Sequence, residues 1–146
     1  MVEEGKPAPD FELTSDSGEQ VKLSDFRGKP VVLYFYPKSD TPGCTAQACG
    51  IRDAYGEFEQ AGAVVLGVSS DKEAVQAKFK SKYELPFSIL ADPDHVAGKA
   101  YDVEKPDSAY FQRSTFIIDA DGNVARIMRN VDARKHADQV LAILSA

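Results

Sequence analysis

Two cysteines, Cys44 and Cys49, are the residues whose types and spacing point most directly to chemistry in this chain of 146 residues. The segment Thr41-Pro42-Gly43-Cys44 is typical of a helix start, with Thr41 at the N-cap and Pro42 at the first helical position. Cys44 then lies in the first turn, where free backbone N–H groups and the helix dipole favour a thiolate. Because the thiolate is the reactive form of cysteine, we predict that Cys44 is a nucleophile. A buried structural cysteine is the alternative.

The spacing between the two cysteines limits when they can react with each other. In a regular α-helix, with a rise of about 1.5 Å and a rotation of about 100° per residue, their Cα atoms lie roughly 8 to 9 Å apart and face different directions. A disulfide requires Cα atoms within about 7 Å, so Cys44 and Cys49 can bond only if the turn between them unwinds. Gly43 and Gly50 flank this turn, and an interior glycine costs a helix about 1 kcal/mol relative to alanine. Our hypothesis is that the turn is weak so that it can melt when Cys44 is oxidised.

Other potential ligands in the chain do not support a metal site. His95 and His136 are its two histidines, and neither lies at a zinc-ligand spacing from the cysteines. We therefore expect each histidine to be a solvated side chain. Residues 119–122 resemble a calcium loop, but the glycine comes too soon and Met128 stands where an acidic ligand is needed. A hairpin turn explains this segment, and we expect no metal.

The composition is typical of one acidic soluble domain. The chain has 17 Lys and Arg against 23 Asp and Glu, so its net charge is 17 − 23 = −6, whereas a nucleic-acid binder needs a basic face. The longest apolar run, residues 31–36, is far shorter than the roughly 20 residues of a membrane span, and the acidic N-terminus lacks a secretory signal. We expect a single domain over residues 1–146, located in the cytoplasm, with neither nucleic acid nor membrane as a partner.

The hydrophobic pattern predicts strands that alternate with helices. The continuous apolar run from Pro30 to Tyr36 is typical of a strand covered on both faces, and Pro37 ends it. The expected elements are a hairpin of strands 11–14 and 19–23, strand 30–36, helix 41–61, strand 63–68, a helix opening at 69–71, strand 87–90, helix 95–101, an irregular stretch 103–111, a hairpin of strands 114–119 and 124–129, and a last helix from 133. This order predicts an α/β fold with a central mixed β-sheet flanked by helices and an N-terminal β-hairpin.

Apolar residues at helical spacing identify the face that each helix buries. The predicted core-facing residues are Ile51, Ala54, Tyr55 and Phe58 in the first helix, Val75, Phe79 and Tyr83 in the second, and Ala137, Val140, Leu141 and Leu144 in the last. The element order also fits a thioredoxin-like topology.

The segment around the first cysteine carries a resemblance to a known family. Residues 34–49 read YFYPKSDTPGCTAQAC and closely resemble the active-site segment of the peroxiredoxins, in particular the bacterioferritin comigratory protein or peroxiredoxin Q subfamily. The match to the motif Pro-x-x-x-Thr-x-x-Cys at Pro37, Thr41 and Cys44 is specific. The resemblance extends along nearly the whole chain, because residues 6–11 look like the N-terminal signature of the family, residues 66–69 its second core strand and residues 113–119 its arginine-bearing strand.

The resemblance implies a role for each motif residue. Cys44 would be the peroxidatic cysteine, which attacks a hydroperoxide and becomes a sulfenic acid, and Arg113 would stabilise the thiolate and the polarised O–O bond. The hydroxyl of Thr41 could hold the peroxide or cap the helix at the N–H of Cys44, and the sequence does not decide between these roles. Pro37 could shield the sulfur or simply end the strand.

Cys49 would be the resolving cysteine, which attacks the sulfenic acid and forms an intramolecular disulfide with Cys44. An external dithiol must then reduce this disulfide, and the family likeness implies thioredoxin. No haem, flavin or metal is needed, and the chain has no Gly-rich dinucleotide motif, so NADPH would act only indirectly. Members of the subfamily are often monomeric, and we expect a monomer. Tyr36, Phe111 and the stretch 103–111 are candidates for the pocket that selects hydrogen peroxide or organic hydroperoxides.

Two other functions use the same cysteines. A thiol-disulfide oxidoreductase of thioredoxin-like fold relies on a C-x-x-C pair at a helix start, whereas this chain has C-x-x-x-x-C, which favours the peroxidase. A peroxide-sensing redox relay would react with peroxide but turn over poorly with thioredoxin. A holdase chaperone, the non-catalytic alternative, would work without Cys44.

Overall fold

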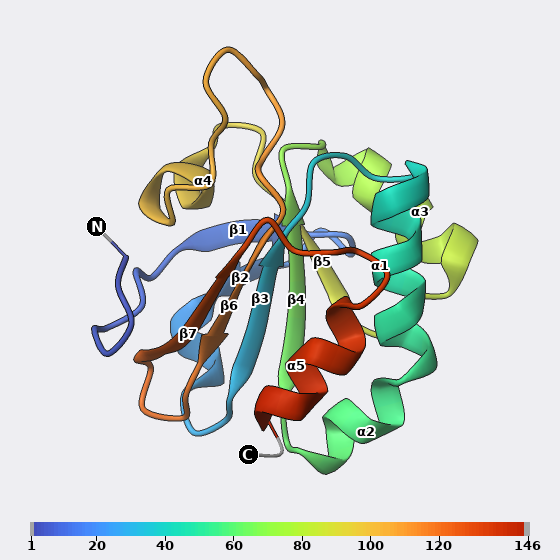
Figure 1. The fold of residues 1–146 in the computed structure, drawn as a ribbon. Coiled ribbons are helices and arrows are strands. Elements are labelled where there is room, and N and C mark those ends of the chain that lie inside the picture. The colour runs from blue at the N-terminus through green and yellow to red at the C-terminus, as the bar shows by residue number, and fades with distance from the viewer. Residues whose placement is uncertain (1, 145–146) are drawn as a thin grey trace.

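The computed structural model describes residues 2–144 and contains one seven-stranded sheet with the strand order β2-β1-β5-β4-β3-β6-β7 (Figure 1). The strands are β1 (Glu12–Ser15), β2 (Gln20–Lys22), β3 (Val31–Phe35), β4 (Val64–Ser69), β5 (Ser88–Ala91), β6 (Ser114–Ile118) and β7 (Val124–Arg129). The helices are the 3-10 helix η1 (Leu23–Phe26), α1 (Pro42–Asp53), α2 (Tyr55–Gln60), α3 (Glu73–Tyr83), α4 (Val96–Ala100) and α5 (His136–Leu144).

The sheet is mixed, and β3 lies near its centre. β3 runs parallel to β4, and β4 runs parallel to β5, whereas β3 pairs antiparallel with β6 and β6 with β7. β1 pairs antiparallel with both β2 and β5, so the N-terminal hairpin extends the sheet at one edge. The predicted α/β fold with a mixed sheet and an N-terminal hairpin is confirmed.

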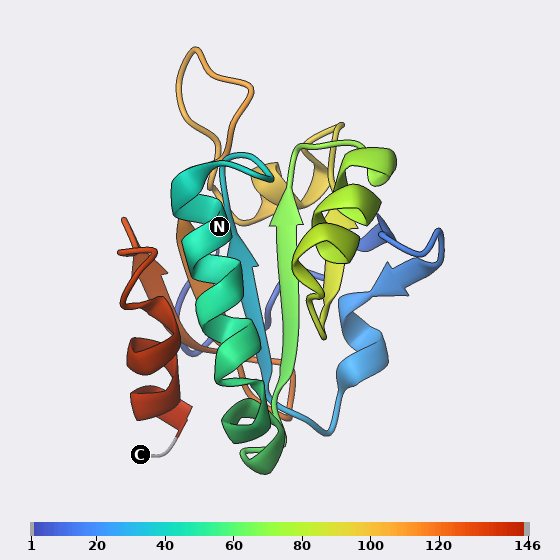
Figure 2. The same cartoon turned by 90° about the vertical axis from the view of Figure 1, so that its right-hand side faces the viewer.

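Helices cover both faces of the sheet, which explains the continuous apolar run in β3. Figures 1 and 2 show α1, α3 and α5 on one face and α4 on the other. Val32 and Tyr34 pack into the core beneath α1, whereas Leu33 and Phe35 pack into the core on the opposite face. Successive side chains of a strand point to opposite faces, so a strand buried on both faces must be apolar throughout.

Two helices differ from their predicted form. The predicted helix 41–61 is interrupted at Ala54, whose φ of −102° and ψ of 11° end α1 and precede α2. The prediction that Val75 faces the core is wrong, since this side chain is 41% exposed and the neighbouring Gln76 is fully buried. Helix α3 turns Gln76 inward because its side-chain amide finds hydrogen-bond partners inside the protein.

Gln76 connects α3 to the sheet and to the segment before α1. Its Oε1 accepts hydrogen bonds from the hydroxyls of Tyr36 and Ser39, each at 2.7 Å. Its Nε2 donates to the carbonyl of Leu90 at 2.8 Å and to the hydroxyl of Ser69 at 3.0 Å. A buried amide with all of these partners is satisfied, and it ties the end of β3 to α3.

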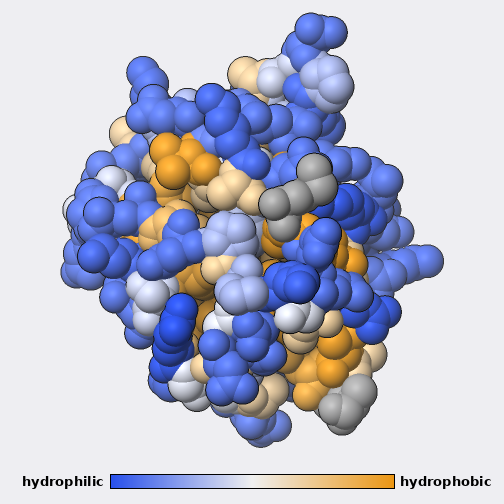
Figure 3. Space-filling model, turned by 90° about the vertical axis from the view of Figure 1, so that its left-hand side faces the viewer, coloured by the Kyte–Doolittle hydropathy of each residue, from blue (hydrophilic) through white to orange (hydrophobic). Residues whose placement is uncertain are grey.

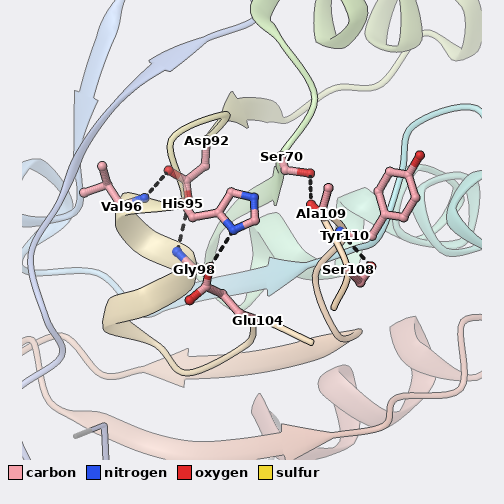
Figure 4. Close-up of polar contacts among 9 residues, drawn as sticks. All are labelled: Ser70, Asp92, His95, Val96, Gly98, Glu104, Ser108, Ala109 and Tyr110. Atoms are coloured by element: carbon pink, nitrogen blue, oxygen red, sulfur yellow. Dashed lines mark hydrogen bonds and ion pairs between the residues drawn. The ribbon is translucent and has the colours of Figure 1, made fainter. Parts of the chain in front are cut away.

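The irregular stretch 103–111 forms a loop that projects beyond the sheet (Figure 1). A β-bridge between Glu104 and Phe111 closes its base, and the hydroxyl of Ser70 donates to the carbonyl of Ala109 at 2.8 Å (Figure 4). The prediction of a solvated His95 is wrong. Its side chain is only 17% exposed and its Nδ1 lies 2.7 Å from a carboxylate oxygen of Glu104, which ties α4 to this loop (Figure 4).

The surface on the side of α4 is mostly hydrophilic, with apolar side chains in patches separated by polar ones (Figure 3). The large hydrophobic side chains that are exposed in residues 2–144 are Val75, Val96 and Tyr110. They belong to three different segments of the chain. No helix within residues 2–144 is both long enough and apolar enough to cross a membrane.

His136 is fully buried, so the prediction of a solvated side chain is wrong here as well. Helix α5 begins at His136 rather than at residue 133, and the imidazole lies one helical turn before the buried Val140. Its Nε2 lies 2.7 Å from the hydroxyl of Thr115 on β6, and its ring packs against Tyr34 with centroids 5.6 Å apart. Burial lowers the pKa of His136 from 6.5 to about 4, and the charge of Arg113 adds to this effect.

We predict that the buried imidazole makes folding pH-dependent in mild acid. The unfolded chain binds a proton on this side chain near its ordinary pKa of 6.5, whereas the folded protein binds it only near pH 4. The free energy of unfolding therefore falls as the pH decreases from 6.5 to 4, by about 3 kcal/mol. Urea denaturation at several pH values measures this fall. His136→Gln loses this part of the pH dependence, and His95→Gln retains it. Equal pH dependence in His136→Gln and the wild type would contradict the prediction.

Candidate active site

The candidate residues gather where β3 ends and α1 begins. This edge of the sheet receives the carboxyl ends of the parallel strands, where α/β proteins commonly place their sites. Buried contacts hold the segment 36–41 in place: the backbone N–H of Ser39 donates to the carboxylate of Asp71 at 2.7 Å, and its hydroxyl donates to Gln76. The residues before α1 are therefore fixed by the neighbouring β4–α3 connection.

Asp40 attaches the same segment to the end of α3. Its backbone is left-handed, with φ of 61°. Its carboxylate accepts a hydrogen bond from the Tyr83 hydroxyl at 2.7 Å and one from the Lys82 ammonium at 2.9 Å. These hydrogen bonds, that of Lys82 first, lower the pKa of Asp40.

Thr41 and Pro42 begin α1 as predicted. Thr41 is the N-cap with extended backbone angles, φ −99° and ψ 157°, and Pro42 is the first helical residue. The Thr41 hydroxyl does not cap the helix; it donates to the carbonyl of Lys38 at 2.9 Å. The sequence left two roles open for this hydroxyl, to hold the peroxide or to cap the helix. The capping hydrogen bond from the Cys44 N–H is not formed. The hydroxyl oxygen keeps its capacity to accept a hydrogen bond.

Cys44 and Arg113, which are far apart in the sequence, meet at the first turn of α1. The Cys44 side chain is almost completely buried, and Nη2 of Arg113 donates to its Sγ at 3.3 Å. Arg113 directly precedes β6, and the pairing of Ser114 with Phe35 places it beside the end of β3. A guanidinium this close to the sulfur favours a negative charge on it, as does the N-terminal end of the helix.

Gln47 belongs to this site, although the sequence reasoning missed it. Its Oε1 accepts a short hydrogen bond from Nη1 of Arg113, and its side chain is buried. Because Gln47 lies three residues after Cys44, both side chains are on one face of α1 and reach the same guanidinium. The spacing from the predicted nucleophile was the signal that could have found it.

Gly43 allows the guanidinium to approach the helix. A Cβ atom at this position would lie 3.1 Å from Nη2 of Arg113, closer than a carbon and a nitrogen normally pack. Our hypothesis explained the glycine at position 43 only by its low helix propensity, which weakens the turn. The close approach of Arg113 gives a second, steric reason for a glycine here.

Cys44 and Cys49 are both free thiols within the unbroken helix α1. Cys49 is half-buried, and four residues of helix lie between it and Cys44, which by helix geometry is too far for a disulfide. Gly50 follows it on the side of α5, where a Cβ would lie 3.9 Å from the Cβ of Ala137. The two cysteines are thus in one helix but not in reach of each other.

The residues predicted for the substrate pocket are only partly accessible. Pro37 is half-buried at the end of β3. Tyr36 and Phe111 are fully buried and do not form an open wall, which corrects our expectation for both. Tyr110 is the exposed aromatic residue of the loop 103–111 (Figure 4). The Lys38 ammonium lies 5.8 Å from its ring centroid. This loop therefore reaches the segment before α1 through Tyr110.

No group of three or more His, Cys, Asp or Glu side chains within residues 2–144 is arranged to hold a metal ion. The segment that resembles a calcium loop is the turn between β6 and β7. In this turn the carboxylate of Asp119 accepts hydrogen bonds from the backbone N–H groups of Asp121 and Asn123, both at 3.0 Å. Asp119 therefore stabilises the turn that connects the two strands of this hairpin.

Comparisons with known proteins agree with this geometry. The AhpC/TSA family matches residues 4–127. Peroxiredoxin Bcp of Bacillus subtilis is 44% identical over 149 residues, which cover 98% of this chain and 95% of the relative. A putative peroxiredoxin bcp of Coxiella burnetii is 41% identical over 149 residues, which cover 98% of this chain and 99% of the relative.

Solved structures of similar proteins share this fold. Peroxidoxin BcpB of Mycobacterium tuberculosis has a TM-score of 0.92 at 33% identity and covers 99% of this chain and 97% of its own. The bacterioferritin comigratory protein of Xanthomonas campestris has a TM-score of 0.87 at 35% identity, with 92% of this chain and 90% of that chain covered. This chain therefore belongs to the AhpC/TSA family and is a peroxiredoxin of the Bcp or peroxiredoxin Q type, a thiol-dependent peroxidase.

Proposed function

We propose that this peroxiredoxin reduces hydroperoxides with Cys44 as the peroxidatic cysteine. The observation that carries the proposal is the 3.3 Å contact between Arg113 and the Cys44 sulfur at the first turn of α1. The thiolate attacks one peroxide oxygen, an S–O bond forms and the O–O bond breaks. The departing alkoxide or hydroxide takes a proton and leaves as alcohol or water, and Cys44 becomes a sulfenic acid.

Thr41 and Pro37 are proposed to bind and shield the peroxide. The Thr41 hydroxyl gives its proton to the Lys38 carbonyl, so its oxygen is an acceptor for the O–H of a hydroperoxide. Arg113 donates from the other side and can stabilise the charge that develops on the breaking O–O bond. Pro37 has no N–H to compete for the substrate and forms a wall of the site.

Cys49 is proposed to resolve the sulfenic acid as an intramolecular disulfide with Cys44, which a dithiol such as thioredoxin then reduces. Four residues of helix lie between the two cysteines, so the reaction requires the turn between them to unwind. The similar protein of Xanthomonas campestris has alkyl peroxide reduction activity, which supports organic hydroperoxides as substrates beside hydrogen peroxide. We propose a monomer; on the face that carries α4, the apolar patches are separate (Figure 3) and offer no single large apolar surface to a second copy.

A peroxide-sensing relay is the second candidate because it needs the same two thiols. The contact of Arg113 with Cys44 activates the sulfur toward peroxide in either case. The candidates differ in recycling: a peroxidase turns over with its dithiol reductant, whereas a relay passes its disulfide to a partner protein. The C-x-x-x-x-C spacing of Cys44 and Cys49 argues against a thiol-disulfide oxidoreductase of the C-x-x-C type.

We predict that the two cysteines fail in different ways when each is replaced. With thioredoxin, thioredoxin reductase and NADPH, the wild type oxidises NADPH in the presence of peroxide. Cys44→Ser is inactive because it lacks the nucleophile, and Cys49→Ser completes a single turnover unless a small thiol is supplied. A wild type whose cysteines are oxidised by peroxide without any oxidation of NADPH would contradict the thioredoxin assignment and favour the relay.

We predict that Arg113→Met slows the oxidation of Cys44 by roughly 100-fold or more, the usual cost of removing one donor that stabilises developing charge. Gln47→Leu has a smaller effect, since the guanidinium stays but loses its support. Rapid mixing with peroxide, acid quench and mass spectrometry measure the rate of sulfenic acid formation. Arg134→Met, which changes an exposed arginine, is the control. A rate for Arg113→Met within about threefold of the wild type would contradict the role of the guanidinium.

A further inference from the structure

A single peptide group connects Asp71 to the hydroxyl of Thr41. The peptide that joins Lys38 to Ser39 donates its N–H to Oδ2 of Asp71 at 2.7 Å, and its carbonyl accepts a hydrogen bond from the Thr41 hydroxyl at 2.9 Å. This peptide is trans, and the N–H and C=O of a planar trans peptide point in opposite directions and turn together. Asp71 fixes the direction of the N–H and therefore also the direction of the carbonyl that receives the Thr41 proton.

The carboxylate of Asp71 is held by the end of β4. Its Oδ2 also accepts a hydrogen bond from the Ser69 hydroxyl at 2.7 Å, and the backbone N–H of Asp71 donates to the oxygen of the same hydroxyl at 3.2 Å. Ser69 is the last residue of β4 and is completely buried. Nε2 of Gln76 donates to the Ser69 hydroxyl at 3.0 Å. The oxygen that receives the Ser39 N–H is therefore anchored to the sheet.

Ser39 completes a closed cycle of hydrogen bonds with these residues. Its N–H is bonded to Asp71, and its hydroxyl donates to Oε1 of Gln76 at 2.7 Å. Gln76 in turn bonds Ser69, which bonds Asp71. Three members of the cycle, Ser39, Ser69 and Gln76, are buried, and a buried polar group that loses its partner costs free energy. The cycle therefore holds the segment before α1 firmly against β4 and α3.

The orientation of the Thr41 hydroxyl decides what it can offer to a substrate. A hydroxyl has one proton to donate and lone pairs that accept. While its proton goes to the Lys38 carbonyl, the oxygen is left to accept a hydrogen bond from a hydroperoxide. If that carbonyl turned away, the proton would be free to bond the Cys44 thiolate instead. A hydrogen bond to a thiolate lowers its pKa, and the nucleophilicity of a thiolate falls with its pKa.

We propose that Asp71 is a positioning residue for the reaction of Cys44 with peroxide, which it supports by fixing the orientation of the Thr41 hydroxyl. It holds the N–H of Ser39, and the attached carbonyl then keeps the proton of the hydroxyl, so that the hydroxyl oxygen is the acceptor for the substrate. The inference rests on the proposed function, since it needs Thr41 to bind the hydroperoxide. Within residues 2–144, Asp71 forms no hydrogen bond or ion pair with Cys44 or Arg113, so its effect is transmitted through the peptide.

Three substitutions of Asp71 separate its hydrogen bonds from its charge. Asp71→Ala removes the acceptor. Asp71→Glu keeps the charge but displaces the acceptor by one methylene group, whereas Asp71→Asn keeps an amide oxygen that can accept both hydrogen bonds and carries no charge. Thr41→Val removes the hydroxyl itself. Asp94→Ala, which changes an exposed aspartate after β5, is the matched control.

Two reactions of Cys44 are compared in the reduced proteins. The first is sulfenic acid formation with hydrogen peroxide, followed by rapid mixing, acid quench and mass spectrometry. The second is alkylation by iodoacetamide, measured on the peptide that contains Cys44. Both reactions need an accessible thiolate, but only the first uses an acceptor for a peroxide O–H. A loss confined to the peroxide reaction therefore reports the orientation of Thr41, whereas general damage to the site slows both.

We expect Asp71→Ala and Asp71→Glu to lower the rate of sulfenic acid formation roughly tenfold, because a small misplacement near the reacting atoms is costly. Alkylation keeps its wild-type rate in both, and Asp71→Asn restores most of the peroxide rate. Thr41→Val slows the peroxide reaction at least as much. Adding Asp71→Ala to Thr41→Val costs less than about twofold more, since the group that Asp71 positions is already absent.

Wild-type peroxide rates in Asp71→Ala and Asp71→Glu, beside a slow Thr41→Val, would overturn the role of Asp71 and leave the proposed function intact. Equal losses in the peroxide and alkylation reactions would also overturn it, as would a loss that Asp71→Asn fails to restore. If Asp71→Ala does not fold, Asp71→Glu and Asp71→Asn carry the comparison. A wild-type peroxide rate in Thr41→Val would overturn the proposed role of Thr41 itself, whatever the variants of Asp71 do.

Discussion

An α-helix cannot bring two side chains five residues apart into disulfide contact, and this constraint governs the chemistry of Cys44 and Cys49. The intact helix α1 presents Cys44 to the guanidinium of Arg113, and it keeps Cys49 out of reach. Folding and resolution therefore make opposite demands on the same turn. The turn must be ordered when peroxide arrives and must open once the sulfur has been oxidised.

Contacts to the rest of the protein are distributed as these demands require. Upstream, the segment before α1 is held by the buried partners of Ser39, which are Asp71 and Gln76. Downstream, Arg52 ties α1 to the end of α3. Between these two anchors, the Arg113 guanidinium donates hydrogen bonds to the Cys44 sulfur and to the Gln47 side chain. Conversion of a thiolate into a neutral sulfenic acid removes the negative charge that the guanidinium and the helix dipole attract, which gives a physical basis for our hypothesis that the turn melts when Cys44 is oxidised.

The elements that sequence reasoning predicted well are those whose signals are local or strongly periodic. The buried β3, the helix start at Thr41 and Pro42 and the two hairpins follow from short-range patterns, and Cys44 with Arg113 follows from a motif. The misplaced residues are buried polar side chains. Polar side chains are expected in solvent by type, yet His136 and Gln76 are buried against partners such as Thr115 and Tyr36 that lie far away in the sequence. Only the three-dimensional arrangement reveals those partners.

Hydrogen exchange of the backbone amides in residues 43–50 tests most directly whether the turn between the cysteines must unwind. Exchange is compared between the reduced protein and a sample shown by mass spectrometry to contain the Cys44–Cys49 disulfide. We predict that these amides lose protection in the disulfide form, while the amides of β3 and β4 keep theirs, because only this turn has to open. Unchanged protection of residues 43–50 in the verified disulfide form would contradict the requirement for unwinding.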